Sequence, residues 1–190
     1  MRHRLLLGCV VPRPIAWVTT VGEDGLVNVA PFSFFTVVST SPPLLAITVE
    51  RHPDGREKHT ASNVRATGEL VVNIAAQEHR EVVEASAAEL PREAGEAERL
   101  GLATTPSVDV RPPRVTGTPI AIECVVHDII RPGGDEVVIA WALRFHVERR
   151  IGRASGHIDV DALRPLARTG GTYRALAPVT PARDPGVPVP

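Results

Sequence analysis

The segment PRPIAWVTTVGEDGLVNVAPFSFF, residues 12–35, decides the fold that this chain of 190 residues adopts. Its first apolar run, residues 15–21, is rich in β-branched and aromatic residues, which favour strands. Turn residues follow at 22–25, and a second strand pattern occupies residues 26–38. Pro31 interrupts that pattern, because a residue without an N–H is excluded from the middle of a hydrogen-bonded sheet. The segment therefore predicts a β-hairpin whose second strand leaves the sheet at an edge or bulge near residues 30–33, where backbone polar groups can face a ligand.

Later parts of the chain add more strand patterns and only short helical ones. Thr60 is expected as the N-cap of a helix that Gly68 ends, and residues 77–90 form a helical pattern with one apolar face. Successive hairpins with few helices predict a mainly β fold, a β-barrel of five to seven antiparallel strands with peripheral helices. Further strands are expected at residues 44–49, 69–76, 119–130 and 136–148, and further short helices at 93–100 and 160–166.

Length and composition predict one domain at residues 1–176 and a proline-rich C-terminal tail at 177–190. The tail is expected to be either disordered or an extended arm against a partner subunit.

A net charge of −1, with 23% charged residues, gives no field that attracts nucleic acid or anionic lipid, so neither nucleic acid nor membrane is an expected partner. No signal peptide or bilayer-spanning apolar run is recognised, so the default location is cytoplasmic. The two cysteines and seven histidines follow no metal-ligand spacing, so no metal site is expected.

The first candidate site is KHTASN, residues 58–63, at the expected start of a helix. It gathers a cation, two hydroxyls and an amide where free backbone N–H groups attract anions, a composition that suits a phosphate. The alternative is an ordinary N-cap preceded by a solvated lysine.

The second candidate site is the cluster at residues 28–35, with Thr19 and Thr20 on the neighbouring strand. Its small residues, hydroxyls and three phenylalanines could hold a flat heteroaromatic ligand. The alternative is that the phenylalanines are core and the threonines face solvent. Because a single expected strand separates the two candidates, they favour one joint site, with a planar ring on residues 28–35 and its phosphate tail on residues 58–63.

The sequence gives little evidence for catalytic side chains. The sequence contains no GxSxG elbow and no cysteine–histidine pairing, so nothing in it indicates covalent catalysis. The two common nucleotide-binding loops, GxGxxG and GxxxxGK[ST], are also absent from the sequence. His146 could face a pocket as a proton donor, although a single strand histidine is more often structural. No catalytic residue is therefore assigned.

Six segments form an ordered pattern across residues 11–173: PRPIAWVTT, NVAPFSFF, SPPLL, KHTASN, GELVVNIA and PLARTGGTY. In this order and at this spacing they resemble the flavin reductase-like family of FMN-binding split barrels. The resemblance implies a split-barrel homodimer that binds FMN near the subunit interface and, in many members, reduces flavin with NADH or NADPH. It assigns Thr19, Ala30, Pro31, Phe32 and Ser33 to the isoalloxazine ring and Lys58, Thr60 and Asn63 to the ribityl phosphate.

Other matched positions carry less defined roles. Arg13 in the first segment, and Arg168, Gly170, Gly171 and Tyr173 in the last, match family positions near the flavin or the dimer contact. Two positions depart from the family pattern: His59 stands where an aspartate is common, and Thr169 where a leucine is common. The first departure alters the hydrogen bonding expected around the phosphate.

The resemblance favours an FMN-dependent NAD(P)H:flavin oxidoreductase, with a nicotinamide nucleotide and flavin as its ligands and a monooxygenase as a candidate partner. Two alternatives stay open. One is an electron carrier that holds FMN without turning over a nicotinamide, and the other is an FMN oxidoreductase that acts directly on an organic substrate. In each case hydride transfer is the chemistry of the cofactor, and the protein supplies orientation and electrostatics.

Overall fold

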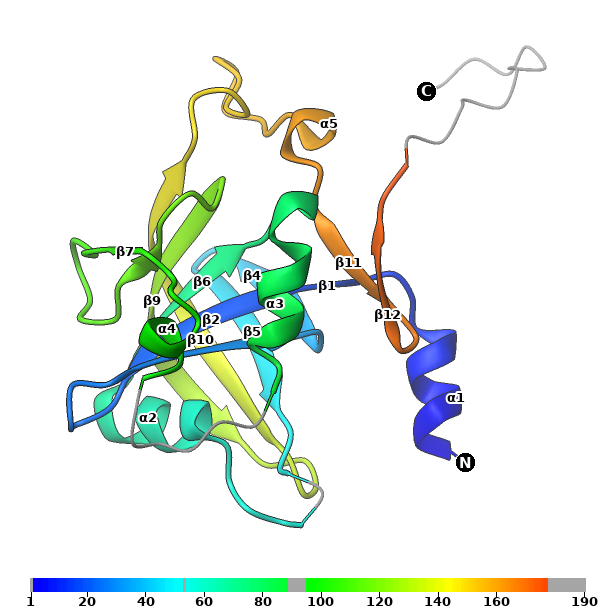
Figure 1. Ribbon diagram of the computed structural model, residues 1–190, viewed down its shortest axis with the longest axis vertical. Helices are drawn as coiled ribbons and strands as arrows, with labels where there is room; N and C mark the ends of the chain where they lie inside the picture. Colours follow the sequence, from blue (N-terminus) through cyan, green and yellow to red (C-terminus); the bar gives the residue numbers. More distant parts are fainter. Residues whose placement is uncertain (1, 53, 89–94, 178–190) are drawn as a thin grey trace.

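A computed structural model describes residues 2–52, 54–88 and 95–177, and its largest element is a seven-stranded antiparallel sheet (Figure 1). The strand order is β3-β2-β6-β9-β10-β5-β4. The two edge strands, β3 and β4, are consecutive in the chain, so the sheet curls until its edges approach each other. The expected mainly β barrel with minor helices is confirmed. The strands are β2 (Ala16–Val21), β3 (Val27–Phe32), β4 (Phe35–Thr40), β5 (Pro43–Val49), β6 (Glu69–Ile74), β9 (Ile120–Ile130) and β10 (Glu136–Val147).

The predicted opening hairpin is present as β2 and β3. The two strands pair from Ala16 opposite Phe32 to Val21 opposite Val27. Strand β3 is an edge strand, as the proline suggested, but Pro31 keeps its register opposite Trp17 and the chain leaves the sheet only after Phe32. An edge strand tolerates proline because a residue whose N–H faces away from the neighbouring strand gives up no ladder hydrogen bond.

The helices differ in detail from the expected ones. Helix α2 (His59–Thr67) ends at Gly68 in the left-handed conformation (φ 70°), as predicted, but its N-cap is Lys58 and not Thr60. The Thr60 hydroxyl instead lies 2.9 Å from the amide of Asn28 on β3, so it links the helix to that strand. The segment expected at 77–90 is a 3₁₀ turn, η1 (Gln77–His79), followed by a short α3 (Arg80–Ala85). The other helices are α4 (Glu96–Arg99), α5 (Val160–Leu163) and an unpredicted α1 (Arg2–Cys9).

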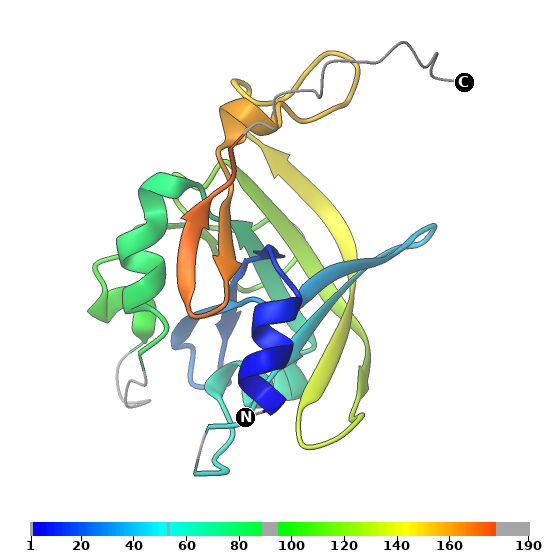
Figure 2. The ribbon, with the colours of Figure 1, turned by 90° about the vertical axis from the view of Figure 1, so that its right-hand side faces the viewer.

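A second, three-stranded sheet lies beside the barrel in the order β1-β11-β12. It joins β1 (Arg13–Pro14) to the hairpin of β11 (Leu166–Thr169) and β12 (Thr172–Ala175), whose turn contains Gly170 at φ 57°. Figure 2 shows this hairpin close to α1. The sequence predicted the glycine turn but not the sheet, and it also missed the small pair of β7 (Thr104–Thr105) and β8 (Arg114–Val115). Most of the predicted tail, like residues 89–90 and 93–94 of the expected helices, lies outside the described residues.

Apolar packing divides into an interior core and an outer one. The interior core fills the barrel with side chains from β2, β5, β6, β9 and β10. The outer core packs α3 and α4 against the other face of β2, and at its centre the Nε1–H of the fully buried Trp17 donates to the Ser86 hydroxyl at 2.9 Å. This packing fixes α3 and α4 in front of the edge strand β3 (Figure 1). Among the helices of the described residues, none is both long and apolar enough to cross a membrane.

Candidate functional site: a cavity in two parts at the barrel edge

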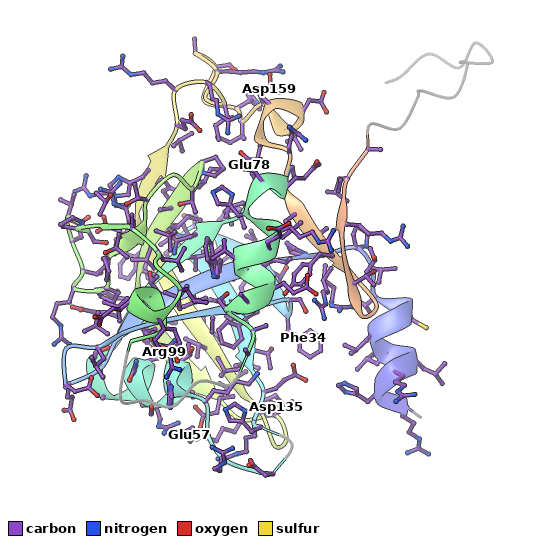
Figure 3. All side chains as sticks on the ribbon, in the orientation of Figure 1. Phe34, Glu57, Glu78, Arg99, Asp135 and Asp159 are labelled. Carbon is purple, nitrogen blue, oxygen red and sulfur yellow. The ribbon has the colours of Figure 1, made fainter. Side chains whose placement is uncertain are left out.

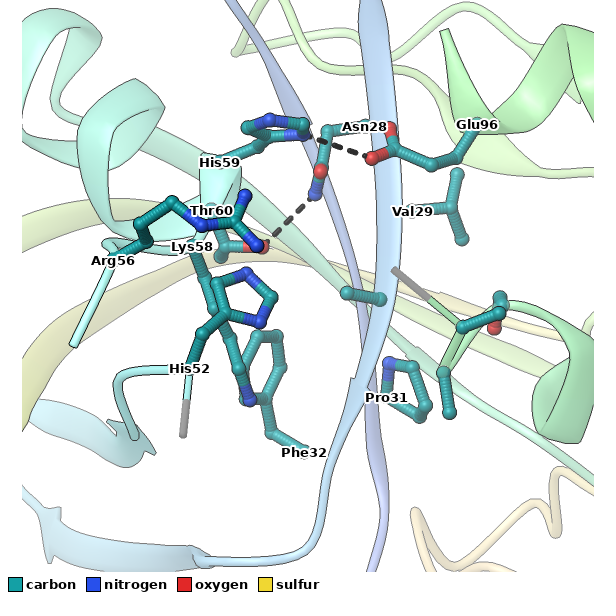
Figure 4. A pocket seen from close by; sticks show the side chains of 14 residues that line it. Asn28, Val29, Pro31, Phe32, His52, Arg56, Lys58, His59, Thr60 and Glu96 are labelled. Atoms are coloured by element: carbon teal, nitrogen blue, oxygen red, sulfur yellow. Dashed lines mark hydrogen bonds and ion pairs between the residues drawn. The ribbon is translucent and has the colours of Figure 1, made fainter. Parts of the chain in front are cut away.

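A cavity of about 560 Å³ lies along β3 (Figure 4). Its volume falls within the range of about 300–1,000 Å³ that small-molecule sites occupy. Strand β3 forms one wall, the loop before α2 forms the opposite wall, and residues after α3 together with Glu96 close the remainder. The lining residues are Asn28, Val29, Ala30, Pro31, Phe32, His52, Arg56, Lys58, His59, Thr60, Ser86, Ala87, Ala88 and Glu96.

Basic groups gather on the α2 side of this cavity. His52, Arg56, Lys58 and His59 all line it, and Figure 4 shows them around the start of α2. The Lys58 ammonium lies 5.6 Å from the centre of the Phe32 ring, in cation–π range. Backbone hydrogen bonding in the helix begins with the Ala61 N–H, which donates to the Lys58 carbonyl at 3.0 Å. The N–H groups of His59 and Thr60 therefore precede the first helical bond, in the position that binds anions at helix N-termini.

A smaller cavity of about 220 Å³ adjoins the first and shares Pro31, Phe32, Lys58 and Ala87 with it. Its other walls come from the link between β3 and β4 and from the second sheet. Figure 3 shows Phe34 in the space between the barrel and α1. The remaining lining residues are Leu7, Arg13, Ile15, Ser33, Phe34, Thr48, Glu50, Arg168, Gly170, Gly171 and Tyr173.

Arg13 forms hydrogen bonds with several segments that surround the smaller cavity. Its guanidinium donates to the carbonyls of Leu7 (2.6 Å), Val10 (3.1 Å) and Gly170 (3.2 Å), and its Nε–H donates to the Ser33 hydroxyl at 3.3 Å. Only 5% of the residue is exposed, and this burial, together with the charge of Arg168, lowers the pKa of Arg13 from its ordinary value. Arginine remains charged in proteins, so Arg13 acts as a fixed cation that holds α1 and the β11–β12 turn against the barrel.

The β11–β12 hairpin adds a stacked pair to the same cavity. The Arg168 guanidinium lies 4.2 Å from the centre of the Tyr173 ring. Burial raises the pKa of the Tyr173 hydroxyl, so this group stays protonated at neutral pH and can donate a hydrogen bond. The pair presents a planar, polarizable surface in the cavity that Pro31 and Phe32 also line.

A buried carboxylate at the larger cavity was not anticipated from the sequence. Glu96 opens α4, and its carboxylate lies 3.1 Å from His59 Nδ1 while only 10% of its side chain is exposed. The Asn28 amide faces both Glu96 and Thr60. With its nitrogen towards Glu96 it donates at 3.0 and 3.2 Å, and its oxygen accepts from the Thr60 hydroxyl at 2.9 Å. The opposite assignment would point the amide oxygen at a carboxylate, so we adopt this one.

The predicted site residues fall into two groups. Nine of them line one or both cavities: Arg13, Ala30, Pro31, Phe32, Ser33, Lys58, Thr60, Arg168 and Tyr173. The other two, Thr19 and Asn63, line neither. The fully buried Thr19 donates its hydroxyl to the Pro113 carbonyl at 2.6 Å, and the Asn63 amide donates to the Thr20 hydroxyl at 3.1 Å. Both side chains support the strands and the helix behind the cavity wall.

His146 lies away from these cavities, at the far end of β10. Its Nε2 is 2.6 Å from the carboxylate of Glu123, a fully buried residue. That carboxylate also accepts from the backbone N–H groups of Val108 and Asp109. Burial alone would raise the pKa of Glu123, but these hydrogen bonds and His146 outweigh it and hold the pKa below its ordinary value. Next to it, burial raises the pKa of the Cys124 thiol to about 12, so this cysteine is an inert core residue.

Comparison with protein families gives a match over residues 7–177 to the flavin reductase like domain. The chain belongs to the flavin reductase-like family. A curated relative, the uncharacterized protein BH2278 of Halalkalibacterium halodurans, is 41% identical over 175 residues, which cover 89% of this chain and 83% of the relative.

Solved structures in the family resemble the whole chain. Nitrilotriacetate monooxygenase component B from Bacillus cereus superposes with a TM-score of 0.90 at 32% identity, covering 95% of this chain and 92% of that one. The 2-nitrobenzoate 2-nitroreductase of Pseudomonas fluorescens superposes with a TM-score of 0.85 at 30% identity, covering 99% and 93%. The fold is thus the flavin reductase split barrel, and the chain is a flavin-binding oxidoreductase of this family.

Proposed function

We propose that this protein is an NAD(P)H-dependent flavin reductase that binds FMN across the two adjoining cavities. The observation that carries the proposal is the difference between the two parts: the larger has basic groups at the N-terminus of α2, and the smaller is lined by the rings of Phe32, Phe34 and Tyr173. Pro31, Phe32 and Lys58 belong to both, so a ligand with a planar ring at one end and a phosphate at the other could span them.

In this proposal the larger cavity holds the phosphate end. Lys58 supplies a mobile ammonium, and the N–H groups of His59 and Thr60 supply fixed donors at the positive end of α2. Thr60 is only 2% exposed and its hydroxyl donates to Asn28, so its contribution is its backbone N–H. A phosphate placed here would meet a charge-assisted set of donors, which bind more strongly than neutral ones.

The smaller cavity would hold the ring end. Pro31 and Phe32 form one wall, the Arg168–Tyr173 pair forms another, and Ser33 is oriented by its hydrogen bond from Arg13. Bound flavin would supply the hydride chemistry itself. The residues of the chain would then bind and orient the ring, exclude water from one face and present the cations of Arg13 and Arg168 near its edge.

The similarity to a monooxygenase component and to a nitroreductase gives two versions of the reaction. In the first, which we favour, the protein is the reductase component of a two-component monooxygenase and passes reduced flavin to its partner. In the second it transfers electrons directly to an organic acceptor such as a nitroaromatic. An FMN-holding carrier without nicotinamide turnover is the remaining alternative.

The test is flavin binding and turnover with purified protein. The proposal expects FMN to bind, and NADH or NADPH to be oxidised at a rate that rises when free FMN is added in excess. Oxidation of nicotinamide that needs no free flavin, but needs a nitroaromatic acceptor, would favour the direct oxidoreductase. A single reduction of bound flavin by the nicotinamide, without continued turnover, would favour the carrier, and an absence of flavin binding would refute all three.

We also propose that the protein is a homodimer. Trp141, Leu143, Phe145 and Val147 alternate along one face of β10 and are 40–56% exposed, whereas Ala140 and Ala142 between them are buried. Exposed Val37 and Val38 lie on β4, two strands away in the same sheet. An apolar strip of this kind is typical of an interaction surface, and a second copy would bury it. The cytoplasmic location stays a prediction, which cell fractionation would test.

A further inference from the structure

The pair of His59 and Glu96 raises a problem for any anion in the larger cavity, because Glu96 places a nearly buried negative charge at a phosphate site. Glu96 lines the cavity, and the residue is 8% exposed. A buried charge is screened far less by salt than a surface charge, so an unneutralised Glu96 would repel a phosphate. Glu96 opens α4 where the chain runs close to β3, since a Cβ added to the preceding Gly95 would lie 2.9 Å from the Val27 carbonyl oxygen.

Protonation of His59 removes this conflict in two ways. The imidazolium cancels the charge of Glu96, to which Nδ1 is already bound at 3.1 Å. It also turns the other ring nitrogen, Nε2, from an acceptor into a donor. Histidine is the side chain whose ordinary charge change falls between about pH 5 and 8, so a change of pH across this range tests both effects.

Other charged groups around His59 do not provide the same control. Lys58 precedes it on α2, His52 and Arg56 belong to the loop across the cavity, and Asp24 lies in the β2–β3 turn beside a small gap that His59 also lines. Lysine, arginine and aspartate keep their charges through this pH range, and the His52 ring lies on the opposite wall from Glu96 (Figure 4).

We propose that His59, set by Glu96, is a proton-dependent specificity residue that admits a phosphate monoester tightly when it is protonated and weakly when it is neutral. The inference rests on the proposed function, since it takes FMN as the phosphate ester. By linkage, bound phosphate would in turn favour the protonated ring. Riboflavin, which has the same ring and no phosphate, should be indifferent to the state of His59.

The experiment measures dissociation constants for FMN and riboflavin at about pH 6 and about pH 8, on either side of the ordinary histidine pKa of about 6.5. The proteins are the wild type, His59→Gln, Glu96→Gln and a control, His157→Gln, which changes an exposed histidine in the turn before α5. The phosphate of free FMN itself ionises near about pH 6, and this part of the pH dependence is common to every variant and cancels in the comparison. Melting temperatures check that each variant is folded.

The proposal expects the ratio of the FMN dissociation constant at high pH to that at low pH to be about five-fold or more larger in the wild type than in His59→Gln. Glu96→Gln should bind FMN more tightly than the wild type at high pH, and His157→Gln should match the wild type. Equal FMN ratios in the wild type and His59→Gln, or equal changes for riboflavin, would overturn this inference while leaving the proposed function intact. Failure of the wild type to bind either flavin would overturn both.

Discussion

Replacing Glu123 by glutamine should destabilise the barrel more than any change of a surface carboxylate. The Glu123 side chain is fully buried on β9, where its two oxygens accept from Val108 N–H (2.9 and 3.1 Å), Asp109 N–H (2.6 Å) and His146 (2.6 Å). Glutamine keeps the shape but replaces one acceptor oxygen by an NH₂ group. An NH₂ at the position of Oε2 would face the Asp109 N–H donor, and an NH₂ at the position of Oε1 would remove the carboxylate oxygen that lies against the His146 ring.

The magnitude follows from that lost acceptor. A hydrogen bond to a charged group contributes about 1.5–3 kcal/mol, and a buried donor left without a partner costs about 1–3 kcal/mol. We therefore expect the free energy of unfolding to fall by about 3 kcal/mol. For a domain of this size each kcal/mol shifts the melting temperature by about 2–4 °C, so the expected drop is about 6–12 °C.

Urea unfolding and thermal melting measure this loss, and Glu148→Gln is the matched control. Glu148 is an exposed glutamate whose carboxylate is paired with Arg150 at the surface, and its substitution should change stability by less than about 0.5 kcal/mol. Hydrogen exchange gives a local reading, because the amides of Val108 and Asp109 should exchange faster in Glu123→Gln. A variant as stable as the wild type, with an unchanged denaturant slope, would refute the reasoning.

The same carboxylate predicts a pH dependence. Because the folded-state pKa of Glu123 is below its ordinary value, its stabilisation is fully present above the unfolded glutamate pKa of about 4.3 and is lost as the pH falls through the lower folded value. The difference in stability between the wild type and Glu123→Gln should therefore shrink as the pH falls below about 4. A difference that stays constant down to acid unfolding would mean that the charge of Glu123 is not what stabilises the loop.

Three further predictions concern the site and the apolar strip. Lys58→Ala should weaken FMN binding by about 10-fold or more, through loss of one charge-assisted hydrogen bond, and should leave riboflavin binding nearly unchanged; equal losses for both flavins would place Lys58 at the ring. Gly95→Ala should cost about 1–3 kcal/mol of stability, measured by urea unfolding, because its Cβ would meet the Val27 backbone at 2.9 Å, whereas Gly133→Ala, at an open turn, should be nearly neutral. Trp141→Glu should convert the proposed dimer into monomers in light scattering after size exclusion, and a wild type that is itself monomeric would contradict the dimer.

Features with a local physical cause were predictable from the sequence. The β2–β3 hairpin follows from alternating β-branched residues and a Gly/Asp turn, and the end of α2 follows from a glycine that can adopt a positive φ. The KHTASN segment, residues 58–63, was also placed correctly at a helix start, although Thr60 was wrong as the N-cap. The sequence could not show that the Thr60 hydroxyl forms a hydrogen bond with the side chain of Asn28, which lies 32 residues earlier in the chain.

Features that depend on distant partners were not predictable. Arg13 reaches Gly170, 157 residues along the chain, and two-residue strands such as β1 carry no periodic pattern. Glu96 comes from a segment with little regularity, and its place beside His59 depends on how closely α4 packs on β3. The one signal for it in the sequence was the Gly95–Glu96 pair, since a glycine directly before a helix allows close approach to another backbone.

The place of the site follows from how this barrel is closed. Strands β3 and β4 are the two edges of the main sheet, and each pairs with one neighbour in it, so the seam between them leaves backbone groups that need other partners. Arg13 and the β11–β12 hairpin cover one part of this seam, and the two cavities occupy another part along β3. A planar ligand with hydrogen-bonding edges is the kind of group that such a seam can accept, because it can meet strand-edge donors and acceptors without a matching strand. The proline that first marked the segment at residues 12–35 therefore lies at the edge where the fold itself leaves room for a cofactor.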